Sequence, residues 1–298
     1  MKVLITGANG LLGQKLVDLL RRQSNTHVIA TARGANRLPS EWDNYAYDEM
    51  DITNARQVAS VIENHRPSVI IHAAAMTQVD DCELNREKCW RHNVTATGYL
   101  LQAAKDIKAH FVFVSSDFVF DGSYGPLNEE VHPSPVNYYG ESKLAAENLV
   151  KQSLVSSAIV RTVLVYGVSH DMSRSNIVLW VKKSLETGQS IRVVTDQWRT
   201  PTLAEDLAMG CWLVAKNKAK GTYHISGEEM FTPYEMAMIT ADFFDLDRSL
   251  IHKTDASQFS QPGKRPAKTG FIIQKAKTGL GYQPHTLREG LEIMKAQI

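Results

Sequence analysis

Short apolar runs alternate with stretches of helical periodicity along the first half of the chain. Runs rich in Val and Ile occupy positions 3–6, 27–31, 69–73, 111–115 and 158–166. Between the first two runs, leucines recur at i, i+4, i+7 and i+8, the spacing of one helical face; they are Leu12, Leu16, Leu19 and Leu20. Strand-like runs separated by helices predict βαβ units, and hence an α/β fold with a doubly wound parallel sheet buried on both faces.

The alternation of apolar runs and helical stretches becomes less regular after Gly167, where residues typical of helix starts appear instead. Three Thr–Glu pairs have the spacing of a capping box, in which both side chains satisfy backbone N–H groups of the first helical turn. The pairs are Thr202/Glu205, Thr232/Glu235 and Thr286/Glu289. They predict helices that start near residues 203, 233 and 287. Polar residues at 257–269 predict a loop, and the lysines at 216, 218 and 220 predict a solvated helix end.

The composition excludes several classes of function. Apolar residues make up 43% of the chain, and 33 basic residues stand against 32 acidic ones, for a net charge of +1. A near-neutral chain has no electrostatic reason to bind nucleic acid or an anionic membrane. No apolar run approaches the ~20 residues of a membrane helix, and the three cysteines suit neither a disulfide framework nor a zinc site. We therefore expect a cytoplasmic protein.

A glycine-rich turn follows the first strand-like run. Gly7, Gly10 and Gly13 form a G-x-x-G-x-x-G pattern, and Leu11 and Leu12 lie inside it at the start of the first helix. Glycine permits a tight turn and a close approach of backbone N–H groups to a pyrophosphate, and the helix N-terminus adds partial positive charge. Placed on the first βα unit, this turn predicts a dinucleotide-binding site.

The end of the second strand-like run indicates which dinucleotide is bound. NAD-binding proteins usually carry an acidic residue there for the ribose 2′-hydroxyl, whereas an arginine accommodates a 2′-phosphate. Here the stretch at 30–34 contains Arg33 and no carboxylate. We therefore predict NADP(H); the alternative is a surface role for Arg33 and acceptance of NAD(H) as well.

A Y-x-x-x-K pair supplies the candidate chemistry. Tyr139 and Lys143 are four positions apart in a stretch of helical periodicity, so both side chains lie on one helical face. An ammonium beside a phenol lowers the pKa of the phenol, so we expect Tyr139 to exchange a proton near neutral pH. Ser116 closes the strand-like run at 111–115 and could donate a hydrogen bond to a substrate oxygen.

Taken together, these residues resemble the extended short-chain dehydrogenase/reductase superfamily, and within it the dTDP-4-dehydrorhamnose reductase family. The resemblance covers nearly the whole chain. Besides the glycine turn and the Tyr139/Lys143 pair, it rests on residues 51–52, 73–80, 93, 115–122, 161–167, 196–202 and 265–266. It implies a dinucleotide-binding Rossmann domain over residues 1–167. Residues 168–298 would then be mainly a smaller substrate-binding region, with some segments returning to the Rossmann domain.

The resemblance also implies a set of site residues. The catalytic residues would be Ser116, Tyr139 and Lys143, with Lys143 also binding the nicotinamide ribose. Besides the glycine turn and Arg33, the cofactor would contact Asp51, Ile52, Ala73, Ala74, Ala75, Asn93 and Ser115. The substrate would contact Thr77, Val79, Asp117, Phe118, Asn176, Gln197, Arg199 and Arg265.

Four positions depart from the family pattern. Phe118 stands where the reductases usually have Tyr, Leu164 where they usually have Trp, and Met76 where Tyr or His is frequent. All three would line the sugar pocket, so they bear on which substrate is accepted. Some members bind magnesium through a Glu two positions after the third glycine. This chain has Lys15 there, so we predict no metal.

The resemblance implies NADPH-dependent reduction of a nucleotide-linked 4-keto-deoxysugar, as in dTDP-rhamnose biosynthesis, by a monomer or homodimer. A nucleotide-sugar epimerase or 4,6-dehydratase is one alternative, although Phe118 replaces the dehydratase Glu and Leu164 the epimerase Asn. The other alternative is a non-catalytic NADP-binding subunit. The regulatory subunit of methionine adenosyltransferase is similar to this family and carries the same Ser-Ser-Asp stretch and Tyr/Lys pair.

Overall fold

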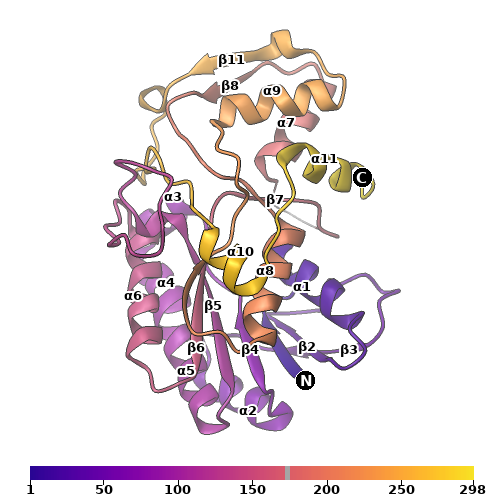
Figure 1. Ribbon diagram of the computed structural model, residues 1–298, viewed down its shortest axis with the longest axis vertical. Helices are drawn as coiled ribbons and strands as arrows, with labels where there is room; N and C mark the ends of the chain where they lie inside the picture. Colours follow the sequence, from indigo (N-terminus) through magenta and orange to yellow (C-terminus); the bar gives the residue numbers. More distant parts are fainter. Residues whose placement is uncertain (172–174) are drawn as a thin grey trace.

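A seven-stranded sheet forms the centre of the larger part of the molecule (Figure 1). The computed structural model describes residues 1–171 and 175–298. All strands of this sheet pair in parallel, in the order β10-β6-β5-β4-β1-β2-β3. They are β1 (Lys2–Thr6), β2 (His27–Ala32), β3 (Tyr45–Glu49), β4 (Val69–His72), β5 (His110–Ser116), β6 (Ser157–Thr162) and β10 (Gly221–His224). The predicted doubly wound parallel sheet is confirmed.

Helices cover both faces of this sheet. One face packs against α1 (Leu11–Arg21), α8 (Ala204–Lys216) and α10 (Gln274–Leu280). The other face packs against α2 (Ala55–His65), α5 (Ala96–Asp106) and α6 (Tyr138–Gln152). Because both faces are buried, the central strands are apolar nearly throughout rather than alternating, as β1 and β4 illustrate.

Three short helical segments and a 3₁₀ turn lie near the carboxyl ends of β4 and β5. After β4 come α3 (Val79–Leu84), α4 (Arg86–Trp90) and a π-helical turn η1 (Arg91–Thr95). The 3₁₀ turn η2 (Asp117–Val119) follows β5 directly. Both α3 and α4 pack against α6, which is the helix that carries the Y-x-x-x-K pair.

A smaller layer lies at one end of the molecule, at the top of Figure 1. It contains a two-stranded parallel sheet of β8 (Ile191–Val194) and β11 (Ile251–Thr254), with α7 (Ile177–Glu186), α9 (Pro233–Phe243) and α11 (Leu287–Lys295). A second small sheet pairs β7 (Val165–Tyr166) with β9 (Thr202–Leu203). The remaining 3₁₀ turns are η3 (Arg248–Leu250) and η4 (Ala256–Gln258). This layer has apolar clusters of its own, and β10, α8 and α10 lie with the large sheet.

Two of the three capping boxes are confirmed and one is wrong. Thr232 and Thr286 cap α9 and α11, and each helix begins at the residue that follows. Thr202 instead lies in β9, and its hydroxyl donates to the carbonyl oxygen of Val163 at 2.6 Å. Helix α8 does start close to the predicted position, but Leu203 precedes it without a side-chain cap.

The predicted strand at 158–166 is also interrupted. It divides into β6 and β7 because Leu164 adopts a left-handed conformation with φ of 35°, which breaks the extended backbone. The two halves pair with different partners, β6 with β5 and β10, and β7 with β9. The lysines at 216, 218 and 220 are all exposed at the end of α8, as predicted.

Candidate active site

The glycine turn is closely packed against the turn that follows β4, the strand next to β1. Gly7 has a φ of 75°, and a Cβ atom there would lie 2.9 Å from the backbone of Ala74. A Cβ on Gly13 would lie 2.1 Å from the carbonyl oxygen of Gly7. A Cβ on Gly10 would meet only that same oxygen, at 3.3 Å. Gly7 and Gly13 are therefore required by packing, and Gly10 faces comparatively open space.

The start of α1 has the properties of a phosphate-binding helix N-terminus. Gly10 is the N-cap residue, and among the described residues no side chain caps this end and no acid lies in the first turn. The N–H groups of Leu11 and Leu12 are thus left for an outside acceptor, and the helix dipole favours an anion there. The turn fits the pyrophosphate of a dinucleotide.

Two arginines lie beyond the end of β2, on the side expected for the adenosine ribose. Arg33 is exposed, and the backbone N–H of Arg37 donates to the Asn9 side chain at 3.0 Å. Glu49, at the end of β3, accepts a hydrogen bond from the backbone of Gly34 at 3.0 Å. The sequence analysis found Arg33 but missed Arg37 and Glu49, because neither ends β2.

The predicted adenine contacts follow β3. Asp51 accepts hydrogen bonds from both the backbone N–H and the hydroxyl of Thr53, each at 2.8 Å. Burial acts to raise the pKa of Asp51, but these bonds and the nearby Arg33 outweigh it and lower the pKa. Ile52 is 8% exposed and packs in the apolar cluster beneath.

The turn at 73–75 follows β4 and is held at both ends. The backbone N–H of Ala74 donates to the Thr6 hydroxyl at 3.2 Å. Asn93, which is buried on the π-helical turn, bonds both backbone groups of Met76 and also donates to the Ser142 hydroxyl at 2.9 Å. Asn93 therefore fastens this turn to α6, and the cofactor contact implied by the resemblance stays a prediction.

The proposed catalytic residues meet at the carboxyl end of β5. Ser116 is the last residue of β5, and its hydroxyl and that of Tyr139 on α6 form a hydrogen bond. Lys143, one turn further along α6, donates to the carbonyl oxygen of Val114 at 2.7 Å, and its ammonium lies 4.1 Å from the ring centroid of Phe113. Tyr139 and Lys143 are 8% and 3% exposed, respectively.

The expectation that Lys143 lowers the pKa of Tyr139 is wrong for the chain as described. Burial raises the pKa of Tyr139, and the nearby Asp117 adds to this, although the bond with Ser116 acts in the opposite direction. Burial also lowers the pKa of Lys143 to about 8. The i, i+4 spacing correctly predicted that Tyr139 and Lys143 lie at the same site. It could not predict how deeply each side chain is buried, and burial determines both pKa values.

Asp117 and Arg199 form a buried pair beside Ser116. The nearest Asp117 carboxylate oxygen lies 3.7 Å from the Arg199 Nε atom, and both side chains are buried. The Arg199 guanidinium also donates to Gln197 and to backbone carbonyls of residues 198, 266 and 267. Both residues were expected to contact substrate, but the protein itself occupies their polar groups.

Three further expected substrate residues also have partners within the chain. Arg265 forms a bidentate ion pair with Asp80, in which its two terminal nitrogens lie 2.5 and 2.6 Å from the two carboxylate oxygens. Asn176 caps α7 and donates to the Gly167 carbonyl oxygen at 2.7 Å. Val79 begins α3 and is buried against Gly263. Thr77 is exposed before α3, and Phe118 is half-buried with its ring edge toward Tyr139, at a centroid distance of 5.9 Å.

Lys15 forms a network with the other half of the chain. Its ammonium lies 2.8 Å from a Glu205 carboxylate oxygen and 2.6 Å from the Gln297 side-chain oxygen. Over residues 1–171 and 175–298, no group of three His, Cys, Asp or Glu side chains is arranged to hold a metal ion. In the same ranges, no helix is long and apolar enough to span a membrane.

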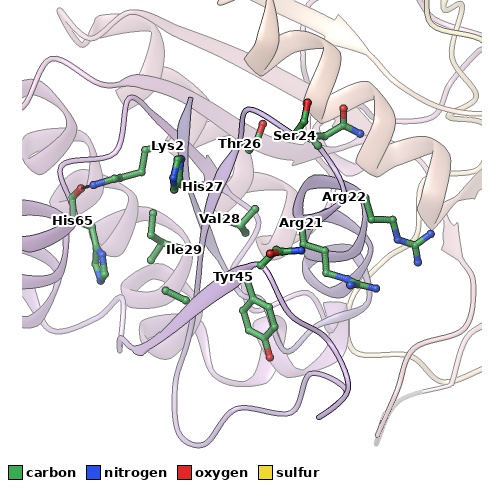
Figure 2. Close-up of a pocket in the computed structure, with 13 residues that line it drawn as sticks. Lys2, Arg21, Arg22, Ser24, Thr26, His27, Val28, Ile29, Tyr45 and His65 are labelled. Carbon is green, nitrogen blue, oxygen red and sulfur yellow. Dashed lines mark hydrogen bonds between the residues drawn. The ribbon is translucent and has the colours of Figure 1, made fainter.

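A separate hollow of about 610 Å³ lies at the opposite ends of the strands (Figure 2). It is lined by the first residues of β1, β2 and β3 and by Arg21, Arg22 and His65. Arg21 and Arg22 pair with Asp18, and His65 pairs with Asp48. Since acids already neutralise these groups, the hollow lacks the convergent polar groups of the β5 end.

Comparison with known proteins agrees with this arrangement. The family model for the RmlD substrate binding domain matches residues 1–298. The chain is 33% identical to methionine adenosyltransferase 2 subunit beta of Mus musculus, over 98% of this chain and 86% of that protein. It is 30% identical to the probable low-salt glycan biosynthesis reductase Agl14 of Haloferax volcanii, over 99% of this chain and 98% of that one.

A solved structure extends the similarity to three dimensions. The dTDP-4-dehydrorhamnose reductase of Bacillus anthracis, crystallised in complex with NADP, superposes with a TM-score of 0.85 at 28% identity, covering 100% of this chain and 99% of that one. The match includes the smaller layer as well as the dinucleotide-binding sheet, because it spans the whole chain. The protein therefore belongs to the RmlD substrate-binding domain family, within the extended short-chain dehydrogenase/reductase superfamily.

Proposed function

We propose that this protein is an NADP(H)-dependent reductase of a nucleotide-linked 4-keto-deoxysugar. The observation that carries the proposal is the assembled set of Ser116, Tyr139 and Lys143 at the end of β5. All three are buried, and two of them are joined by a hydrogen bond.

The cofactor would lie across the carboxyl ends of the strands. The glycine turn and the N-terminus of α1 would hold the pyrophosphate, and Arg33 with Arg37 would face a 2′-phosphate. When bound, NADPH would supply the hydride. Lys143 is the only ammonium that reaches into the described site from α6, and we assign it to the nicotinamide ribose.

Proton transfer is assigned to Tyr139. Because burial raises the pKa of this phenol, it remains protonated at neutral pH and is available as a general acid. It would protonate the oxygen of the substrate ketone as hydride adds to the carbonyl carbon. Lys143, whose pKa is lowered by burial to about 8, is assigned to the nicotinamide ribose rather than to the phenol.

The substrate class is inferred from relatives and from the pocket. Two similar proteins are named as reductases, one acting on dTDP-4-dehydrorhamnose and one in glycan biosynthesis. Phe118 replaces a usual Tyr and would present an apolar ring beside Tyr139, at a centroid distance of 5.9 Å. We therefore expect the sugar to be a deoxysugar with few hydroxyl groups on that side.

A subunit of methionine adenosyltransferase is the second candidate. It is favoured by the 33% identity to that subunit of Mus musculus over nearly the whole chain. An epimerase or dehydratase is less favoured, because Phe118 cannot transfer a proton in elimination chemistry. These readings differ in one measurable quantity, which is the net consumption of NADPH.

The test is a panel of nucleotide-linked 4-ketosugars, assayed with purified protein for loss of NADPH absorbance. We expect steady oxidation with at least one of them, and oxidation at least ~10²-fold slower with the Tyr139→Phe variant. A redox-neutral conversion of a sugar would instead support the epimerase alternative. Absence of any turnover, together with co-purification of a methionine adenosyltransferase, would replace the reductase proposal by the subunit one.

A further inference from the structure

A buried carboxylate lies directly behind the proposed catalytic serine. Asp117 is 3% exposed, and its two oxygens have separate partners. One accepts the Ser116 hydroxyl at 3.0 Å, and the other accepts the hydroxyl of Thr269 and faces Arg199. Burying a carboxylate is costly unless such partners compensate it. The arrangement therefore fixes Asp117 within the site.

Arg199 is held as tightly as the carboxylate that it faces. Its two terminal nitrogens donate to four oxygens, of which Pro266 and Trp198 provide the shortest contacts at 2.6 and 2.7 Å. Its remaining N–H, on Nε, faces Asp117 at 3.7 Å, which is an ion-pair distance rather than a hydrogen bond. Four of the five N–H donors of the guanidinium therefore have acceptors within the described chain.

The hydrogen bonds of Ser116 have a definite direction. A serine hydroxyl has one proton and two acceptor positions. The Ser116 proton is donated to Asp117, and its oxygen accepts the backbone N–H of Phe118 at 3.2 Å. The Ser116 side chain also forms a hydrogen bond with the Tyr139 side chain, and this contact acts to lower the pKa of the phenol. In this arrangement Asp117 sets the orientation of the Ser116 hydroxyl.

We propose that Arg199, Thr269 and Asp117 are positioning residues that fix the orientation of the Ser116 hydroxyl beside Tyr139. This inference rests on the proposed function, since Ser116 and Tyr139 are its site residues. It changes one expected role, because Arg199 acts through Asp117 rather than on substrate.

These contacts also join two parts of the sequence that are far apart. Arg199 and Thr269 lie beyond residue 167, whereas Asp117 and Ser116 end β5 of the large sheet. Residue 268 donates to the carbonyl oxygen of Gly122, and residue 198 to that of residue 267, so the segment around Thr269 is fastened on both sides. A displacement of that segment would alter the rotamer of Ser116.

Thr269→Val is the sharpest variant, because it removes one hydroxyl while keeping the size and β-branching of the side chain. We expect kcat for the 4-ketosugar to fall roughly 10-fold, as for a general acid held slightly out of place, with KM changed by less than about twofold. Thr269→Ser restores the hydroxyl and should restore most of kcat. The matched control is Thr240→Val, a buried threonine on α9 whose hydroxyl bonds only to its own helix.

A crystal structure of Thr269→Val supplies a readout that does not require turnover. We expect Ser116 to leave the rotamer in which it donates to Asp117. An unchanged Ser116 rotamer, or equal losses of kcat in Thr269→Val and Thr269→Ser, would overturn the positioning role. If the wild type reduces no ketone, the proposed function fails, and the positioning inference is then decided by the Ser116 rotamer alone.

Discussion

The environment of Tyr139 determines what this residue can do. It is buried beside Asp117, and its hydroxyl bonds to Ser116, so the phenol is both protonated and fixed in direction. Lys143 is directed to the Val114 carbonyl oxygen rather than to the phenol. The two residues therefore have separate roles: Tyr139 is the proton donor, and Lys143 is a cation beside the expected nicotinamide ribose. Replacing Tyr139 should lower turnover without weakening cofactor binding.

Tyr139→Phe removes only the phenolic oxygen. Turnover should fall by at least ~10²-fold, the smallest loss expected when a general acid is removed. NADPH should bind with nearly wild-type affinity in a fluorescence titration, because the glycine turn and Lys143 are unchanged. Retention of most of the activity on the true substrate would show that Tyr139 is not the proton donor.

Arg33→Ala tests the preference for NADP(H). Loss of a charge-assisted hydrogen bond to the 2′-phosphate should weaken NADPH binding roughly 10-fold to 100-fold and leave NADH binding nearly unchanged. The matched control is Arg22→Ala, an exposed arginine at the opposite end of the sheet, which should change neither affinity. Equal wild-type affinities for NADPH and NADH would contradict the assignment of Arg33.

Several site residues could be found from the sequence, and others could not. Gly7, Gly13, Tyr139 and Lys143 are recognisable because their spacing itself encodes a turn or a shared helical face. The pairing of Arg199 with Asp117 and of Arg265 with Asp80 joins residues 82 or more positions apart, and no local pattern reports it. Such pairs give partners within the chain to side chains that were expected to contact substrate.

Helix α11 shows how much a single cap contributes at the scale of an element. It has nine residues, and its apolar face packs into the smaller layer through Leu287, Leu291 and Met294. A helix this short depends on packing and on its ends rather than on intrinsic propensity. The Thr286 cap could be predicted because Thr286 and Glu289 are only three positions apart, and both bonds of the capping box are present.

Thr286→Ala should lower the free energy of unfolding by about 1 kcal/mol, the usual contribution of an N-cap hydroxyl. For a chain of this size that corresponds to a decrease in Tm of about 2 °C. Thr286→Ser keeps the hydroxyl and should have nearly the wild-type Tm in a calorimetric scan. If the Ala and Ser variants melted together, the capping box would not contribute to stability.

The Thr202 pair shows the limit of the same pattern. Its sequence spacing equals that of Thr286/Glu289, but Thr202 continues into β9 and pairs with β7. Its hydroxyl is buried and satisfies Val163 at the break between β6 and β7. Contacts with residues far away in the sequence place Thr202 in a strand rather than at a helix cap. A four-residue pattern contains no information about such contacts.

At the scale of the whole molecule, buried histidines should make the fold sensitive to acid. Burial lowers the pKa of His72 and of His224 to about 3 each, and that of His110 to about 4. In the unfolded chain each would titrate near 6.5, so between these values the unfolded state binds more protons. The contribution of these histidines to stability should therefore be constant above about pH 7 and should fall as the pH decreases below 6.5.

A fully buried histidine of this kind costs about 2 kcal/mol of stability between pH 8 and pH 5. Replacing His72 by Gln should reduce the dependence of Tm on pH over this range, even if it lowers the Tm at pH 8. His132→Gln, at an exposed loop position, is the control and should preserve the wild-type slope. An identical slope in the two variants would show that His72 is not kept neutral by burial.

The layered architecture could be predicted because its signals are repeated along the chain. Each βα unit has its own apolar run and helical period, so the parallel sheet follows from many weak signals that agree. The placement of residues 196–202 and 263–269 against the end of β5 has no such repetition. It is set by a few contacts, of which Asp117–Thr269 and Asp80–Arg265 are the clearest.

Isotope transfer tests the central claim most directly. The protein would be incubated with NADPH deuterated at the transferred position of the nicotinamide ring and with the nucleotide-linked 4-ketosugar consumed in the panel. We predict that the product sugar gains one deuterium at C4, seen by mass spectrometry, for each NADPH oxidised. A product without deuterium, or conversion of the sugar with no loss of NADPH, would contradict the assignment of this protein as a reductase.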